Sequence, residues 1–528
     1  MENNKKPGVF RSAAVMSVAT LMSRFLGLAR ELLIAMYFGA SGMTDAFWVA
    51  FRVPNMLRDL LAEGNFNSAF LPVLTEETKK SERKGVQVFL SSGLLLLAIT
   101  LVLAILICFF STEIVQFIAP AFADSPKVFF ATDISVKILA FFLPLVSLAA
   151  ISMAFLNVRK LFFIPALAPA TLNVMMILSI VFLTPVLISN GIEPVFALSI
   201  GGITGGAAQF FAQVPFLVRE KAFQKVKIVL FSPAVKKIFY RMSIGIIGVA
   251  ATQINLLIST FLATGAGFGA VSYLTYSMRL FQFPVGVFGV SLSNSNLVYF
   301  SDAIKSGDFN EGRTVLKKSY HLSLLLLIPA TLALFLLAEE ATFLIFERGK
   351  FNNLDREMTA MALRAYLIGL PFYCIFKLIG PTFYALDKEK IPIGISIFSI
   401  IVNIIFSVSL IDRFGFVILA YGVSLSVIVN SLLQIIFLRK ELNIGFKFFA
   451  TKTFFSILLS GFLPFAILVF IKKYIFPISL ASWWKCLFLS VGYGLIFGVL
   501  FVGLLFLCGE REQINRFISK IKKNNPSN

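Results

Sequence analysis

Apolar runs of about twenty residues recur from one end of the chain to the other. The chain is 58% hydrophobic and only 14% charged, which is outside the range of ordinary soluble domains. We therefore predict an all-α integral membrane protein with about fourteen transmembrane helices. The predicted spans are residues 10–38, 44–74, 86–110, 133–156, 162–187, 195–218, 236–263, 269–300, 319–339, 358–385, 391–411, 415–438, 449–471 and 485–508.

The charges between the spans predict an orientation. If the N-terminus is cytoplasmic, most loop lysines and arginines fall on the cytoplasmic side, as the positive-inside rule requires. The opposite side then holds only Lys127, Arg348, Lys350, Arg356, Arg413, Lys472, Lys473 and Lys485. Removing the span 44–74 would disrupt this alternation, so we predict that it crosses the membrane despite its charges. Both termini are then cytoplasmic.

The sequence also contains an internal repeat. Three pairs of matching residues share one spacing of 227 positions: Arg52 with Arg279, Pro144 with Pro371, and Pro165 with Pro392. Each pair falls in spans that are six helices apart, and an even number of helices preserves orientation. We therefore predict two parallel repeats of six helices each, related by an axis along the membrane normal.

This repeat divides the chain into four predicted parts. Residues 1–225 form an N-terminal lobe and residues 226–448 a C-terminal lobe. Residues 449–508 hold two further helices, and residues 509–528 form a basic cytoplasmic tail.

Charged residues gather in the first two predicted helices. They are Arg24, Arg30, Glu31, Asp45, Arg52, Arg58, Asp59 and Glu63. A charge at the bilayer centre costs about 2.5–3.5 kcal/mol on insertion scales, so such residues usually face a cavity or a partner. We interpret the group as the lining of a polar cavity in a transporter. The competing interpretation, ion pairs that only lock helices together, stays open for any single residue.

Helical spacing suggests how some of these charges pair. Arg24 and Glu31 are seven residues apart, within about 20° of one face of a helix, and can neutralise each other. Arg30 points roughly 120° away, so the same pairing does not explain it. On the next helix Pro54 can introduce a kink, which weakens any argument about the face on which Arg52 and Arg58 lie.

The second half supplies further cations at membrane depth, Arg279 and Lys377. A guanidinium group stays charged and matches the oxygens of a phosphate with a rigid fork of donors. Arginines from both halves that converge on one cavity would suit a phosphate- or pyrophosphate-bearing substrate.

Several functions are excluded by what the sequence lacks. It has no phosphate-binding GxxxxGK[ST] loop, no HExxH motif and no cysteine–histidine cluster, so we predict a transporter without a cofactor and not an enzyme. The net charge of +20 would suggest nucleic acid in a soluble protein, but here it lies mostly in cytoplasmic loops. We therefore expect no nucleic-acid partner.

Residues 23–72 carry a specific resemblance. The runs SRFLGLARE and FGASGMTDAFWVAFRVPNMLRDLLAEGNFNSAFLPVL resemble the N-terminal signature of the MurJ (MviN) family of bacterial lipid II flippases. The similarity continues through YSMRLFQFPVGVFGVSL, FERGKF and KLIGPTFYALDKEKIP, over essentially the whole chain. One departure is Asp59, which stands where a basic residue often follows the family's arginine.

The resemblance implies a member of the multidrug/oligosaccharidyl-lipid/polysaccharide exporter superfamily, with two lobes around a central cavity that opens alternately to either side. The implied substrate is lipid II, the undecaprenyl-diphosphate-linked disaccharide pentapeptide, which is moved from the inner to the outer leaflet of the bacterial cytoplasmic membrane for cell-wall synthesis. The last two helices would help to form a lateral groove for its lipid tail. The family's important cavity residues match Arg24, Arg30, Asp45, Arg58 and Arg279, and Glu31, Glu63 and Lys377 match further charged positions.

Other questions stay open at this point. The driving force can be the membrane potential, an ion gradient with an unidentified coupling ion, or consumption of the product outside. A cation-coupled drug or oligosaccharide-lipid exporter of the same superfamily is the alternative transporter. A scaffold that binds cell-wall synthesis enzymes is the alternative from another class.

Overall fold

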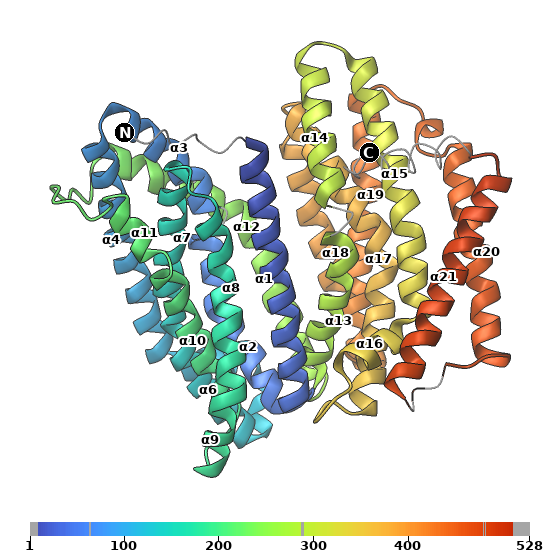
Figure 1. Cartoon of the computed structure of the whole chain (residues 1–528), viewed down its shortest axis with the longest axis horizontal. Helices are drawn as coiled ribbons and strands as arrows, with labels where there is room; N and C mark the ends of the chain where they lie inside the picture. Colours follow the sequence, from blue (N-terminus) through green and yellow to red (C-terminus); the bar gives the residue numbers. More distant parts are fainter. Residues whose placement is uncertain (1–8, 63–64, 287–289, 479, 481, 511–528) are drawn as a thin grey trace. The chain divides into compact units, whose positions relative to one another are not determined.

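The computed structural model describes residues 9–62, 65–286, 290–478, 480 and 482–510. These residues form helices and connecting segments, with no β-strand among them (Figure 1). They divide into two compact units. The first comprises Met1–Ser272 with Arg348–Phe351, and the second comprises Tyr273–Glu347 with Asn352–Asn528. The division into two compact units does not test the lobe boundaries that the repeat predicts, so those boundaries stay a prediction.

The first unit consists of α1 (Val9–Phe38), α2 (Gly42–Leu61), α3 (Asn65–Lys80), α4 (Glu82–Phe109), α5 (Ser111–Ile118), α6 (Pro126–Ala140), α7 (Phe142–Val158), α8 (Phe163–Leu178), α9 (Thr184–Ser189), α10 (Phe196–Phe211), α11 (Val214–Arg219) and α12 (Pro233–Gly265). Helix α13 (Ala270–Pro284) begins in this unit and continues into the second. The second unit adds α14 (Val290–Lys305), α15 (Phe309–Leu336), α16 (Ala338–Phe346), α17 (Asn353–Ala385), α18 (Lys390–Phe414), α19 (Val417–Glu441), α20 (Lys452–Tyr474) and α21 (Trp483–Leu507).

Nine helical stretches of the described residues are long and apolar enough to cross a membrane. Helix α12 provides a tenth if its segments Pro233–Ile246 and Val249–Gly265, which meet at 48°, count as one span. The prediction of an all-α protein with many spans is confirmed, whereas the number fourteen stays a prediction. The other predicted spans are charged or fall on shorter helices; for example, residues 269–300 fall on α13 and α14.

The helix bounds follow the predicted repeat. Shifted by 227 residues, Glu82–Phe109 (α4) becomes Phe309–Leu336, which are the bounds of α15. The same shift turns Pro126–Val158, the stretch of α6 and α7, into Asn353–Ala385, the bounds of α17. Matching residues therefore start and stop matching helices in the two halves of the sequence.

Glycines allow α10 to pack closely on its neighbours. A Cβ atom on Gly205 would lie 2.5 Å from Leu172 Cδ1 and 3.0 Å from the Leu172 Cα on α8. On another side of α10, a Cβ atom on Gly206 would lie 2.7 Å from the ring of Phe142 on α7. Only glycine fits such close approaches. This packing fixes α8, which contributes to the candidate site.

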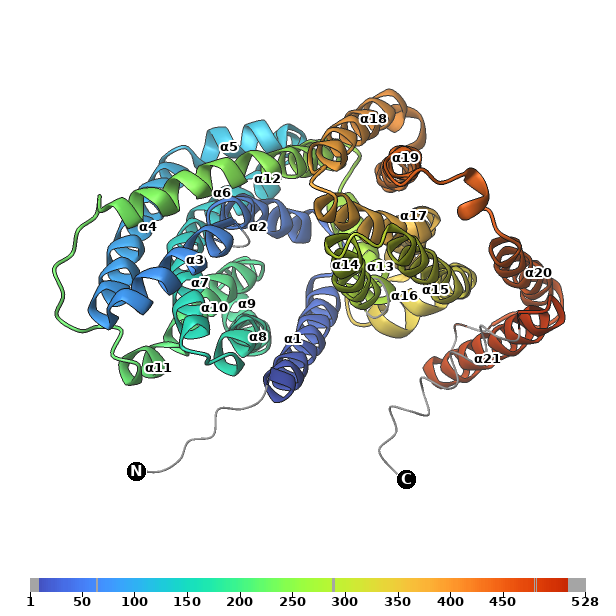
Figure 2. The same cartoon turned by 90° about the horizontal axis from the view of Figure 1, so that it is seen from above.

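In the second unit α20 and α21 lie side by side, and α20 also packs on α15 (Figures 1 and 2). Near one end of α20, Lys472 donates to the Leu336 carbonyl oxygen at 2.7 Å and pairs with Glu340 at 2.7 Å. The Glu340 side chain is buried and that of Lys472 is 19% exposed, so this ion pair is largely shielded from water. The Trp483 indole at the start of α21 donates to the Leu344 carbonyl oxygen at 3.0 Å.

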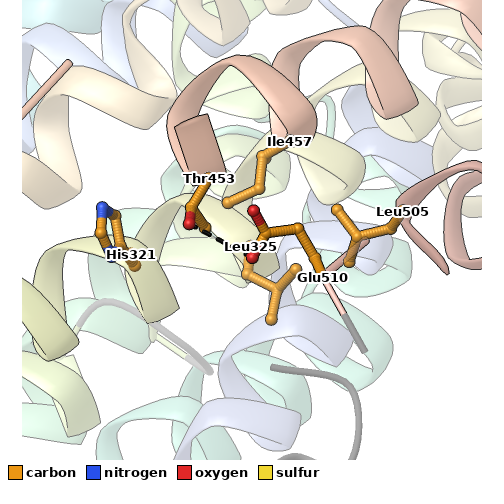
Figure 3. Close-up of a pocket in the computed structure, with 6 residues that line it drawn as sticks. All are labelled: His321, Leu325, Thr453, Ile457, Leu505 and Glu510. Atoms are coloured by element: carbon orange, nitrogen blue, oxygen red, sulfur yellow. Dashed lines mark hydrogen bonds between the residues drawn. The ribbon is translucent and has the colours of Figure 1, made fainter. Parts of the chain in front are cut away.

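The other ends of α20 and α21 are also attached. Thr451, the residue that caps α20, contacts His321 Nε2 on α15 at 2.8 Å. The Thr453 hydroxyl donates to Glu510 at 3.2 Å, and His321 lines the same small pocket (Figure 3). The contact of His321 with Thr451 helps to hold the final helix pair against α15.

Candidate functional site

Arg30 is held by polar groups inside the first unit. Its side chain lies on α1 and the residue is only 8% exposed. Its Nη2 pairs with Glu31 Oε1 at 2.5 Å, and its Nη1 donates to Asn173 Oδ1 on α8 at 2.9 Å. The Asn173 amide in turn donates to the Ser23 carbonyl oxygen at 3.1 Å. A buried charge needs hydrogen-bonding partners of this kind. Asn173 of α8 therefore fixes the position of the Arg30 guanidinium.

The predicted pairing of Arg24 with Glu31 is wrong. Glu31 pairs with its neighbour Arg30, because the long arginine side chain bends toward the adjacent carboxylate and Asn173 holds it there. Arg24 is exposed, and among the described residues it has no hydrogen bond or ion pair.

Arg58 is half-buried on α2, beyond Pro54. Its Nη2 lies 3.0 Å from Asp59 Oδ1, and its Nε also donates to that oxygen, at 3.3 Å. The other Asp59 oxygen accepts from Gln253 on α12 at 3.3 Å. Asp59, the departure from the family pattern, therefore supplies a carboxylate for the arginine before it. Arg52, on the same helix, is half-buried.

Asp45 is fully buried near the start of α2. One carboxylate oxygen accepts from the Ser272 amide at 2.8 Å and the Ser272 hydroxyl at 2.6 Å, and the other accepts from the Gly269 amide at 2.6 Å. The Ser272 amide lies in the first turn of α13 and the Gly269 amide directly precedes this helix. The N–H groups of a first turn have no partner within the helix. Asp45 thus caps α13, the helix that carries Arg279. Its predicted contact with substrate stays a prediction.

The C-terminal end of α1 is held by a hydrogen bond between backbone groups. Lys350, in the predicted FERGKF motif, donates its amide to the Met36 carbonyl oxygen at 2.9 Å, which satisfies one of the last carbonyls of α1. Gly349 has a positive φ of 62°, and a Cβ atom there would collide with the same carbonyl. Glycine is therefore required at this approach.

The second unit carries the two other predicted cations. Arg279 is exposed on α13, and Lys377 is exposed on α17. The convergence of cations from both halves on one cavity stays a prediction. Glu63 lies outside the described residues.

A largely apolar groove of about 520 Å³ runs along α20. It is lined by Lys452, Phe455, Ser456, Leu458, Leu459, Phe462 and Cys508. It lies on the helix pair for which the resemblance implies a groove for a lipid tail, and that assignment stays a prediction.

The sequence identified most of these charges but not the groups that position them. Asn173, Gln253 and Ser272 were missed, because each meets its partner across more than 100 positions of sequence. A polar residue within an apolar run, such as Asn173, was the only available signal. Among the described residues, no group of three or more His, Cys, Asp or Glu side chains is placed to hold a metal ion. The arrangement offers fixed cations for an anion.

Comparison with known proteins gives the family. The sequence profile of the family described as "Lipid II flippase MurJ" matches residues 34–494. A relative from Burkholderia cenocepacia, named "Lipid II flippase MurJ", is 34% identical over 438 residues, covering 82% of this chain and 84% of that protein.

Solved structures agree with this result. One titled "Lipid II flippase MurJ, inward closed conformation" has a TM-score of 0.76 and 26% sequence identity, and it covers 93% of this chain and 100% of that one. An inward-facing drug transporter of the MATE family has a TM-score of 0.66 at 12% identity, covering 82% of this chain and 98% of that one. The second likeness shows a shared fold alone. The chain therefore belongs to the lipid II flippase MurJ family, and it is a membrane protein with many spans.

Proposed function

We propose that this chain flips lipid II from the inner to the outer leaflet of the bacterial cytoplasmic membrane by alternating access. The observation that carries the proposal is the long match to lipid II flippases, from residue 34 to residue 494. The diphosphate of such a substrate needs cationic partners, and the fixed cations at membrane depth can supply them.

The substrate's two parts pose different physical problems. Its diphosphate, sugar and peptide head group cannot cross hydrocarbon unaided, because charged groups are costly there. Its long tail is apolar and can stay in lipid throughout. A basic cavity with a lateral opening lowers the barrier for the head group, and the groove along α20 offers the tail an apolar surface.

We assign diphosphate binding to Arg24, Arg30, Arg58 and Arg279, with Arg52 and Lys377 as additional cations. The Arg30 guanidinium supports this role because Glu31 and Asn173 hold it in one place before substrate arrives. Preorganised donors bind an anion without a cost for ordering their own side chains. The carboxylates of Glu31 and Asp59 partly neutralise the positive charge of these arginines, so that lipid II can leave the site.

The alternative of a cation-coupled drug exporter is not favoured. The drug transporter matches at 12% identity, against 34% for a flippase over most of the chain. We also propose that the protein acts without covalent chemistry, that both termini are cytoplasmic, and that cell-wall synthesis enzymes consume its product.

Growth of a bacterium depleted of its own flippase tests this function. The wild-type chain should restore growth, and Arg24→Ala, Arg30→Ala and Arg279→Ala should each fail while reaching the membrane at wild-type levels. Arg413→Ala, in the last turn of α18, is the matched control and should restore growth. Full rescue by all three arginine variants would contradict the assignment of these residues.

A further inference from the structure

The connector of residues 221–231 joins α11 to α12 in the first unit without forming a helix. Figure 2 shows it as a green trace on the outer side of α4. Two hydrogen bonds attach its backbone to this helix. The Gln87 amide donates to the Lys227 carbonyl oxygen at 2.7 Å, and the Val229 amide donates to the Ser91 hydroxyl oxygen at 3.1 Å. The connector therefore has a fixed place on the surface of α4.

These hydrogen bonds also indicate the depth of the connector. Helix α4 starts with the charged residues Glu82 and Arg83, which belong in water or among lipid head groups, and an apolar run follows them. Ser91 lies about 13 Å along the helix from Glu82, at 1.5 Å per residue. The connector thus lies where α4 enters the bilayer. An irregular segment that faces lipid cannot lie deeper, because its other backbone groups would have no partners in hydrocarbon.

The connector presents large apolar side chains at this level. Phe223, Ile228, Leu230 and Phe231 are exposed, and Phe231 is 68% exposed. Val226, by contrast, packs against the core of the first unit. The four exposed side chains contribute little to that core, and burial in lipid would remove their apolar surface from water.

Three exposed lysines lie among these apolar side chains: Lys221, Lys225 and Lys227. The sequence from residue 214 to residue 240 contains six basic residues, and Glu220 is its one acidic residue. Within the ranges that the structure describes, none of the three lysine side chains has an ion pair. Their charge is therefore available to anions outside the protein.

We infer that the connector is a docking surface for anionic phospholipids. Its apolar side chains enter the edge of the acyl layer, and its lysines contact the phosphate groups above them. Lysines near a membrane surface are attracted to anionic head groups, and exposed apolar residues beside them add to the binding. The occupant is a phospholipid and not an acidic soluble protein, because the apolar side chains lie at a depth that a soluble partner does not reach. This binding goes beyond the proposed function and is independent of what the chain transports.

Fluorescence quenching by brominated lipids tests the inference on the full-length chain in phosphatidylcholine nanodiscs. Phe231→Trp places a tryptophan on the connector, and the emission of the native tryptophans is subtracted by using the unsubstituted chain. Bromine on the upper acyl chain quenches a tryptophan that it contacts. Brominated phosphatidylglycerol should quench the introduced tryptophan about threefold more effectively than the same fraction of brominated phosphatidylcholine. High salt should reduce this preference.

Removal of the three lysines separates their role from that of the apolar side chains. The combined variant Lys221→Gln, Lys225→Gln and Lys227→Gln should quench equally with both lipids, while quenching by brominated phosphatidylcholine stays the same. The matched control removes the same charge from exposed positions of the second unit, with Lys305→Gln, Lys318→Gln and Lys390→Gln. The control should keep the threefold preference.

Three results would overturn the inference. The first is equal quenching by the two brominated lipids when all lysines are present. The second is a tryptophan at position 231 that acrylamide quenches from water and bromine does not, which would favour a soluble acidic partner. The third is the same loss of preference in the control, which would make it an effect of overall charge. The growth test of lipid II flipping is separate from all three.

Discussion

Asp45 accepts two hydrogen bonds from Ser272, its amide at 2.8 Å and its hydroxyl at 2.6 Å, and the two residues are 227 positions apart. This spacing is also the one that relates the two halves of the sequence. Matching positions of the repeat, one near the start of α2 and one in the first turn of α13, therefore contact each other. The Asp45 carboxylate therefore caps the helix whose first turn contains Ser272.

Replacing Asp45 should destabilise the protein. Asp45→Ala leaves the buried amides of Gly269 and Ser272 without their acceptor, and we expect a loss of roughly 2–4 kcal/mol in the free energy of unfolding. Ser272→Ala removes only the hydroxyl bond and should cost about 1 kcal/mol. Thermal unfolding in detergent measures both. Equal stability of Asp45→Ala and the wild type would rule out the cap.

Asn173 should be needed for transport because it orients Arg30. Asn173→Leu removes the acceptor that is 2.9 Å from the guanidinium, and we expect transport per folded molecule to fall about tenfold. Asn430→Leu is the control, since Asn430 is also buried and hydrogen-bonded but lies on α19 away from these arginines in sequence. A similar fall in both variants would show that any buried asparagine gives this effect.

Gly349 should tolerate alanine less well than another glycine with a similar backbone. Gly191 has a φ of 68°, and a Cβ atom there would meet no other atom within 4 Å, whereas at Gly349 the Met36 carbonyl occupies the space that a Cβ atom needs. Gly191→Ala should cost about 1–2 kcal/mol from backbone strain alone. Gly349→Ala should cost roughly 1–3 kcal/mol more because of the collision. Equal melting temperatures of Gly191→Ala and Gly349→Ala would contradict the close approach of Gly349 to the Met36 carbonyl.

The ion pair of Glu340 with Lys472 should behave as a buried pair. Glu340→Leu leaves the Lys472 ammonium without its carboxylate and should lower stability by about 3–5 kcal/mol. The double variant with Lys472→Met should recover most of this loss, because no charge then stays buried. The exposed pair Lys80–Glu76 is the comparison, and breaking it should cost about 1 kcal/mol or less. A double variant as unstable as the single one would disprove the pairing.

The sequence could predict the features that depend on local pattern. Apolar runs gave the helical membrane fold, and three matched pairs gave the offset that the bounds of α4 and α15 follow. The contact between the Lys377 ammonium and the Tyr373 ring, whose centroid is 5.5 Å away, was also accessible in principle, because Tyr373 is four residues before Lys377 and so lies on the same face of a helix.

The contacts of the charged residues were not accessible in the same way. A helical wheel gives the direction of a Cβ atom, but the reach of an arginine side chain lets Arg30 bend to Glu31, its neighbour in sequence. The cap that Asp45 provides involves amides 224 and 227 positions away, and no local pattern predicts such partners.

The most direct test of the central claim is the share of lipid II in the outer leaflet of living cells. We would measure it with a membrane-impermeant reagent for the head group, in a bacterium depleted of its own flippase and supplied with this chain or with Arg30→Ala. The account predicts that the wild-type chain restores the outer-leaflet share and that Arg30→Ala leaves lipid II in the inner leaflet. An outer-leaflet share that stays the same with and without the wild-type chain would contradict the account.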